Sequence, residues 1–192
     1  MHSLKYQLAV IKGERDMNSV ESGHAVRTAP VYEVLAADIK SLGVEAVFGL
    51  MSDDTALFVT ALDMVGITFH GGRHENAAIS MAEGYAYASG SLGIAVVGRG
   101  PATANGLHAA VYAARTGSRV LIIYGDAAFG TSSTNALGPD YKAFNALGVL
   151  TAAGLQVLRA TSAAGARTTL ADAAGLAMQG NAVALLLPTS IQ

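Results

Sequence analysis

Short apolar runs alternate with stretches of helical periodicity from about residue 29 to the end of the chain. Six runs rich in β-branched and aliphatic residues predict strands, at residues 45–48, 66–69, 94–97, 120–124, 155–158 and 182–187. Between them, apolar side chains recur at helical spacing, first at Val31, Val34, Leu35, Ile39 and Leu42, and again at Ala77, Ala78, Met81, Ala82 and Tyr85. The alternation of strands and helices predicts an α/β fold.

Several of the strand runs are apolar without alternation, which is typical of strands that are covered on both faces. We therefore expect a mostly parallel, six-stranded sheet in a three-layer α/β/α arrangement with right-handed crossovers. Ligands of such sheets bind at the carboxyl ends of the strands. The functional residues are expected in the glycine-rich segments that follow Phe48, Phe69, Val97 and Tyr124.

The length of 192 residues fits one domain with a tail. Hydrophobic residues make up 52% of the chain and charged residues 14%, which is enough apolar material for a core. The first 28 residues lack a sustained period. We predict a polar leader over residues 1–28, for which disorder is one interpretation, and a folded domain over residues 29–192.

The formal net charge is −2, so there is no basic surplus to attract a nucleic acid or an anionic membrane surface. Cysteine is absent, which removes disulfides, thiolate nucleophiles and cysteine-ligated metals. No apolar run approaches the roughly 20 residues that cross a bilayer. These features predict a cytoplasmic protein that binds neither nucleic acid nor membrane.

Four segments together carry a resemblance to a known family. They are GGRHEN at 71–76 with the alanine-rich helix AAISMAEGYA after it, GIAVVGRGPATAN at 93–105, the strand at 119–126, and the strand and proline turn at 181–192. In order and spacing they resemble the N-terminal pyrimidine-binding (PYR) domain of thiamine-diphosphate-dependent enzymes of the acetolactate synthase type. Four matches in order are more specific than one glycine motif.

The resemblance implies a role for Glu75. In that family the matching glutamate hydrogen-bonds N1′ of the cofactor's aminopyrimidine and moves a proton there, which activates the cofactor. A partly buried carboxyl group suits this task, because it can hold its proton closer to neutral pH and exchange it in place. Without the family, the favoured interpretation of Glu75 is an acidic residue that stabilises the first turn of a helix.

The resemblance further implies that Gly98, Gly100 and Pro101 form a tight turn that approaches the pyrimidine. Glycine suits such a turn, because it tolerates positive φ and close approach. Asn105 would anchor the following helix or the turn, or it would cap or pack the helix.

Ser52, Asp53, His70 and Arg99 lie in or beside the loops that face substrate in the family, and they are candidates for substrate contact. Asp53 and its neighbour Asp54 could instead cap a helix, which is the commoner use of aspartate at a helix start. His70 could simply be solvated. His74 matches a family histidine that is structural, and His108 within a helix is packed or exposed.

The chain also departs from the family pattern. Met51 lies in a loop where many relatives have a proline-glycine pair. Arg99 replaces a serine or histidine, Ala102 replaces the last glycine of the turn, and Ala104 replaces the threonine before the asparagine. These departures bear on the substrate and on the level of activity.

The family's diphosphate-binding segment, glycine-aspartate-glycine with downstream asparagines, has no counterpart in this sequence. The segment that begins at Gly125 and Asp126 resembles this pattern only superficially. No histidines or carboxylates lie at metal-ligand spacing, so no metal site is expected in this chain. Mg²⁺ and the diphosphate would be held by a diphosphate-binding (PP) domain of the same or another chain.

The sequence therefore predicts half of a thiamine-diphosphate-dependent lyase or transferase, which decarboxylates or carboligates a small 2-oxo acid. Two alternatives stay open: a non-catalytic PYR-fold module for assembly or ligand binding, and a separate small subunit similar to that of sulfopyruvate decarboxylase. A face built to meet another domain would leave apolar surface exposed, so a homodimer or tetramer is expected.

Overall fold

The computed structural model describes residues 28–128, 134–135 and 138–192. The predicted leader lies outside these ranges, apart from Thr28. The main element is a six-stranded sheet in which every neighbouring pair of strands is parallel. In spatial order its strands are β2 (Thr68–Gly71), β1 (Ala46–Gly49), β3 (Gly93–Val97), β4 (Val120–Asp126), β8 (Val183–Pro188) and β7 (Gln156–Arg159).

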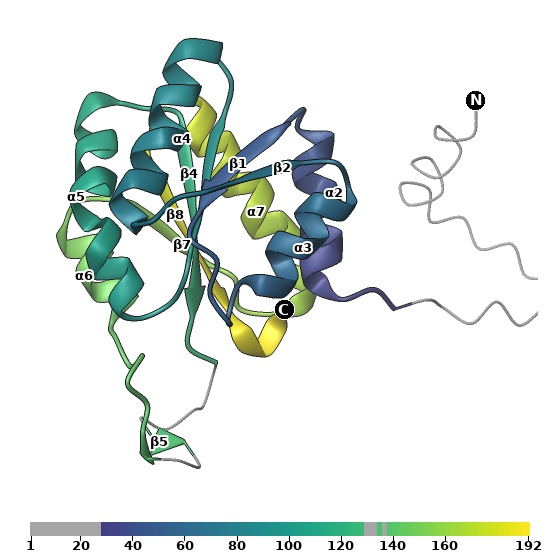
Figure 1. The fold of residues 1–192 in the computed structure, drawn as a ribbon, viewed down its shortest axis with the longest axis vertical. Helices are drawn as coiled ribbons and strands as arrows, with labels where there is room; N and C mark the ends of the chain where they lie inside the picture. The colour runs from purple at the N-terminus through teal and green to yellow at the C-terminus, as the bar shows by residue number, and fades with distance from the viewer. Residues whose placement is uncertain (1–27, 129–133, 136–137) are drawn as a thin grey trace, which may run out of the picture.

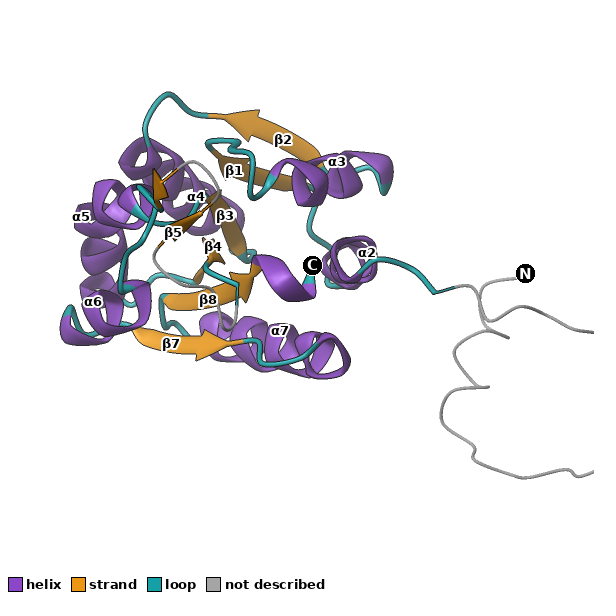
Figure 2. Ribbon diagram, turned by 90° about the horizontal axis from the view of Figure 1, so that it is seen from below, coloured by secondary structure: helices purple, strands orange, loops and turns teal. Residues whose placement is uncertain are grey.

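Helices cover both faces of this sheet (Figure 1). One face carries α2 (Val31–Ser41), α3 (Ala56–Met64) and α7 (Ala163–Met178). The other carries α4 (Glu75–Ser89), α5 (Pro101–Thr116) and α6 (Ala146–Ala152), as Figure 2 shows. A short antiparallel pair, β5 (Thr134–Asn135) and β6 (Gly138–Pro139), and the 3₁₀ helix η1 (Thr189–Ile191) complete the described elements. The predicted three-layer α/β/α fold with a six-stranded parallel sheet is confirmed.

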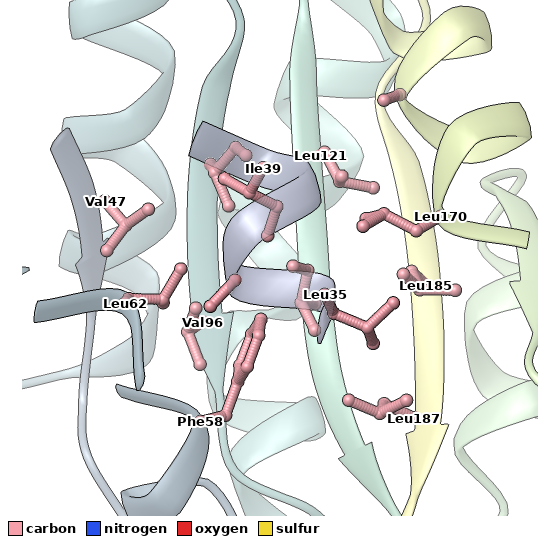
Figure 3. Packing of buried hydrophobic residues seen from close by; sticks show 14 of the residues in the cluster. Leu35, Ile39, Val47, Phe58, Leu62, Val96, Leu121, Leu170, Leu185 and Leu187 are labelled. Atoms are coloured by element: carbon pink, nitrogen blue, oxygen red, sulfur yellow. The ribbon is translucent and has the colours of Figure 1, made fainter. Parts of the chain in front are cut away.

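The core follows from the unalternated apolar strands. All residues of β3, β4 and β8 are buried, because helices pack on both of their faces. On the first face, Leu35 and Ile39 of α2 and Phe58 of α3 pack with side chains of the central strands (Figure 3). The edge strand β2 is mostly exposed. The continuously apolar runs of the sequence therefore form the central strands of the sheet.

Strand β2 begins two residues later than predicted. The sequence indicated a strand from residue 66, but Gly66 has a φ of 76° and its amide donates to Asp63. The amide of Ile67 donates to Leu62. Both residues therefore close the end of α3, and Ile67 is buried in the core without belonging to the strand.

Small residues bring α4 close to the sheet and to α5. A Cβ atom at Gly93 of β3 would collide with the backbone carbonyl of Ala82 on α4. A Cβ atom at Gly106 of α5 would lie 2.7 Å from Cδ1 of Ile79 and 3.5 Å from Cβ of Glu75, both on α4. The alanine- and glycine-rich composition of these helices therefore sets the position of the start of α4.

Candidate functional site

The strand order produces a topological switch point between β1 and β3. These strands are neighbours in the sheet, but the chain leaves β1 towards α3 on one face and leaves β3 towards α5 on the other. In parallel sheets a crevice opens where two outgoing connections diverge in this way, and ligands bind there. The loop after β1, residues 50–55, and the turn after β3, residues 98–100, lie beside each other at this switch point.

Asp54 connects the loop after β1 to the turn after β3. Its Oδ2 atom accepts a hydrogen bond of 2.7 Å from the backbone amide of Arg99, and its Oδ1 atom accepts one of 2.9 Å from the hydroxyl of Ser52. The ammonium group of Lys142 lies 3.0 Å from the same Oδ1 atom. The side chain of Asp54 is 4% exposed. A buried carboxylate with three donors is well satisfied, and it holds the loop and the turn together.

Arg99 and Lys142 add a second set of contacts. The guanidinium of Arg99 donates to both oxygens of Asp140, at 2.8 and 3.3 Å. The Lys142 amide donates to Asp140 at 3.0 Å, and its ammonium group also pairs with Asp53. Residues 140–142 therefore lie across the turn after β3, and this segment was not foreseen from the sequence.

The charges of this network stabilise one another. The Arg99 guanidinium holds the pKa of Asp140 below its ordinary value, and the pKa of Arg99 is raised in return. Hydrogen bonds from Lys142 and with Asp54 lower the pKa of Asp53. Burial lowers the pKa of Lys142, but its hydrogen bonds to Asp53 and Asp54 outweigh burial, and the net pKa is raised. These shifts favour the charged forms of Asp53, Asp140, Arg99 and Lys142 near neutral pH.

The expectation that Asp53 or Asp54 caps a helix is wrong. Helix α3 begins at Ala56, its N-cap residue is Thr55, and no side chain caps it by a hydrogen bond. The two aspartates lie in the turn before it and bind Lys142 and, for Asp54, the amide of Arg99. The sequence favoured capping because it does not reveal the actual partners: for Asp54, Arg99 and Lys142 lie 45 and 88 residues away.

Glycines make room for the network. A Cβ atom at Gly98 would lie 2.6 Å from Oγ of Ser52, and one at Gly100 would collide with the backbone carbonyl of Lys142. Gly100 also has a φ of 72°, which favours glycine. A Cβ atom at Gly125 of β4 would collide with Oδ2 of Asp54. At both Gly98 and Gly100, the position that a Cβ atom would occupy is therefore already filled by atoms of neighbouring loops.

Glu75 is the first residue of α4 and is 7% exposed. Helix α4 starts where it does because His74 is its N-cap residue: Nδ1 of His74 accepts from the amide of Asn76 at 3.2 Å. The side chain of Asn76 in turn accepts from the amide of Ala109 on α5 at 2.8 Å. These bonds and the contact with Gly106 fix Glu75 between the two helices.

The Glu75 carboxylate forms no hydrogen bond or ion pair with any other described residue. The residue as a whole is mostly buried, but its carboxylate oxygens are not among the fully buried side-chain atoms without a hydrogen-bond partner in the described ranges, which are the hydroxyls of Thr103 and Tyr124. The other two mostly buried carboxylates of this edge, Asp54 and Asp126, have cationic partners, and Asp126 pairs with Arg159 at 2.7 Å. Glu75 is thus chemically distinct among them, and it is the residue best suited to meet an external group.

The remaining predicted site residues do not gather at one point. His70 is exposed near the end of β2, and its ring stacks on Phe48 with centroids 5.2 Å apart. Pro101 begins α5, while Asn105 lies exposed inside this helix and is not a cap, because the N-cap residue is Gly100. His108 is exposed on the same helix. The structure therefore brings Ser52, Asp53 and Arg99 into one network and leaves His70 and Asn105 outside it.

Within the described ranges, no group of three or more histidine, aspartate or glutamate side chains has an arrangement that could hold a metal ion. None of the helices in the same ranges is both long and apolar enough to span a membrane.

Comparison with known proteins identifies the class of the chain. Residues 30–146 match the family described as thiamine pyrophosphate enzyme, N-terminal TPP binding domain. This stretch includes Glu75, the turn after β3 and the whole Asp54 network. The chain belongs to this family of thiamine-diphosphate-binding domains, and the predicted family is confirmed; three of the four sequence segments lie within the matched residues, while the segment 181–192 lies beyond them.

A similar curated protein is 2-hydroxyacyl-CoA lyase 2 of Danio rerio, which is 34% identical over 96 residues. The match covers 50% of this chain and 16% of the relative. The matched part of the chain therefore corresponds to a small part of that protein's length.

Proposed function

We propose that this chain supplies the pyrimidine-binding half of a thiamine-diphosphate-dependent active site, and that Glu75 is its catalytic residue. When bound, the cofactor supplies the carbanion chemistry for breaking or forming a carbon–carbon bond. Glu75 would hold a proton at N1′ of the aminopyrimidine and exchange it there. The observation that carries this proposal is the position of Glu75 at the start of α4, as a mostly buried residue whose carboxylate has no hydrogen-bond or ion-pair partner among the described residues.

The surroundings of Glu75 fit an aminopyrimidine ring. The backbone and Cβ atom of Glu75 lie at the start of α4 beside Gly106 of α5, so the helix packing sets the point from which the carboxylate extends. The turn at Gly98 and Gly100, followed by Pro101, would present its backbone to the ring. Asn105 is exposed on α5, where it would contact the cofactor or the domain that completes the site.

The diphosphate and Mg²⁺ would be held by a PP domain of the same or another chain, as the family implies. We propose a homodimer or tetramer in the cytoplasm as the working state, because the site is complete only when a PP domain meets the start of α4 and α5.

Two reactions are proposed for test. The first is acetolactate synthase-like decarboxylation or carboligation of a small 2-oxo acid, with Ser52, Asp53, His70 and Arg99 as candidates for substrate contact. The second follows from the relative named a 2-hydroxyacyl-CoA lyase, whose name makes 2-hydroxyacyl-CoA thioesters a second substrate class. Both reactions need the same activation of the cofactor by Glu75.

The test combines the full chain with a PP domain, thiamine diphosphate and Mg²⁺, and measures turnover of a 2-oxo acid and of a 2-hydroxyacyl-CoA. Glu75→Gln keeps the size of the side chain and removes its acid–base function, so the rate should fall by about 10²–10⁴-fold. The matched control is Glu83→Gln on the same helix, where the carboxylate accepts from Thr116 and Ser118. Equal rates for Glu75→Gln and Glu83→Gln would contradict the proposal and favour a non-catalytic module.

A further inference from the structure

The turn after β3 is held by a carboxylate from another loop. Asp54 accepts from the backbone amide of Arg99, at the centre of the turn, and from Ser52 in its own loop. The Arg99 amide belongs to the peptide between Gly98 and Arg99, so the bond fixes the orientation of that peptide. A charge-assisted hydrogen bond donated to a mostly buried carboxylate is among the stronger contacts available to a backbone amide.

Three glycines on two backbone segments, β4 and the turn after β3, leave space for this carboxylate and its partners. Gly125 on β4 lies where a side chain would displace Oδ2 of Asp54, and Gly98 lies where one would displace the hydroxyl of Ser52. Gly100 allows the backbone of Lys142 to approach. Glycine at three positions around one carboxylate indicates that the position of the Asp54 side chain is built into the fold.

We propose that Asp54 is a positioning residue, which acts through the backbone amide of Arg99 to set the turn that faces the cofactor. Lys142 completes the arrangement, because it pairs with Asp54 and brings residues 140–142 against Gly100. The effect on the cofactor rests on the proposed function, in which this turn contacts the aminopyrimidine. The effect on the turn itself does not depend on that function.

The first measurement is hydrogen exchange of the Arg99 amide, followed by NMR on the full chain without cofactor. In Asp54→Ala this amide loses its acceptor, and its exchange should become at least about tenfold faster. Gly125→Ala should have the same effect while the aspartate is retained, because the new methyl group displaces the carboxylate. This second variant keeps the test decisive where Asp54→Ala does not fold.

The second measurement is the concentration of thiamine diphosphate that gives half-maximal activity in the chain combined with its PP domain. Asp54→Ala and Gly125→Ala should raise it by about tenfold, which corresponds to about 1.4 kcal/mol of binding free energy. The maximal rate at saturating cofactor should change by less than about threefold, since Glu75 is untouched. A residue that only stabilised the fold would lower the amount of active protein and would leave the half-saturating concentration unchanged.

The control variant is Asp38→Asn. Asp38 forms a bidentate ion pair with Arg167 between α2 and α7, away from the switch point, so its removal should leave both measurements at their wild-type values. Wild-type exchange of the Arg99 amide in Gly125→Ala, or wild-type half-saturation in both variants, would overturn the positioning role. Full activity of Glu75→Gln would instead contradict the proposed function, whatever the Arg99 amide does.

Discussion

The backbone amide of Arg99 lies 2.7 Å from Oδ2 of Asp54, a residue 45 positions earlier in the chain. This hydrogen bond joins the loop after β1 to the turn after β3 across the switch point of the sheet. The two segments belong to different helical layers beyond this point, since one leads to α3 and the other to α5. The relative position of these two segments therefore depends on a contact between a side chain and the backbone as well as on the sheet.

The first prediction concerns stability at acid pH. The pKa values of Asp53 and Asp140 are lowered in the folded protein, while unfolded aspartate has a pKa of about 3.9. Below about pH 4 the unfolded state therefore binds more protons than the folded state, and the free energy of unfolding falls as the pH drops. Their contribution is fully present above that range. Denaturant unfolding at pH 7, 5, 4 and 3 measures this fall.

In Asp140→Asn the free energy of unfolding should fall less steeply with decreasing pH than in wild type. The variant lacks one carboxyl group with a lowered pKa and leaves Arg99 without its bidentate partner, so it should also be less stable than wild type at pH 7. An identical pH dependence in the variant would mean that the Arg99–Asp140 pair makes no contribution to folding.

The second prediction concerns a buried hydroxyl group. Tyr124 is fully buried at the centre of the sheet, its burial raises its pKa, and its OH has no hydrogen-bond partner among the described residues. Tyr124→Phe removes an unsatisfied polar atom and keeps the ring. The free energy of unfolding should stay unchanged or rise by up to about 1 kcal/mol. A loss of more than about 1 kcal/mol in urea unfolding would show that the hydroxyl has a stabilising partner.

The third prediction compares Gly93 of β3, which packs against α4, with Gly84, which lies within α4. Gly93→Ala places a methyl group against the backbone carbonyl of Ala82, which cannot move without shifting the helix, and should cost about 1–3 kcal/mol. Gly84→Ala is the matched control: Gly84 is exposed inside α4, and its Cβ position is open. This substitution should raise the free energy of unfolding by about 0.5–1 kcal/mol. Equal effects of the two would contradict the close packing of α4 on β3.

The strands and the start of α4 could be predicted because their signals are local. The runs that became β3, β4 and β8 are continuously apolar, and Glu75 follows a strand and precedes an alanine-rich helix. Each of these patterns lies within about 15 residues. Burial on both faces of the sheet and the position of the glutamate follow from them directly.

The network around Asp54 could not be predicted in the same way. Lys142 lies 88 residues from Asp54, and Asp140 lies 41 residues from Arg99. These contacts exist because the strand order makes β1 and β3 neighbours, and no periodicity within either loop encodes that order. The one local signal, two aspartates before a helix, favoured capping and was misleading, because α3 begins only at Ala56.

The central claim is that the Glu75 carboxylate activates the cofactor. The most direct test is the exchange of the C2 proton of thiamine diphosphate for deuterium, measured by NMR in the full chain combined with its PP domain and Mg²⁺. Wild type and Glu83→Gln should exchange this proton at the same rate, and Glu75→Gln should be slower by at least about 10²-fold. Exchange at the wild-type rate in Glu75→Gln would contradict the account.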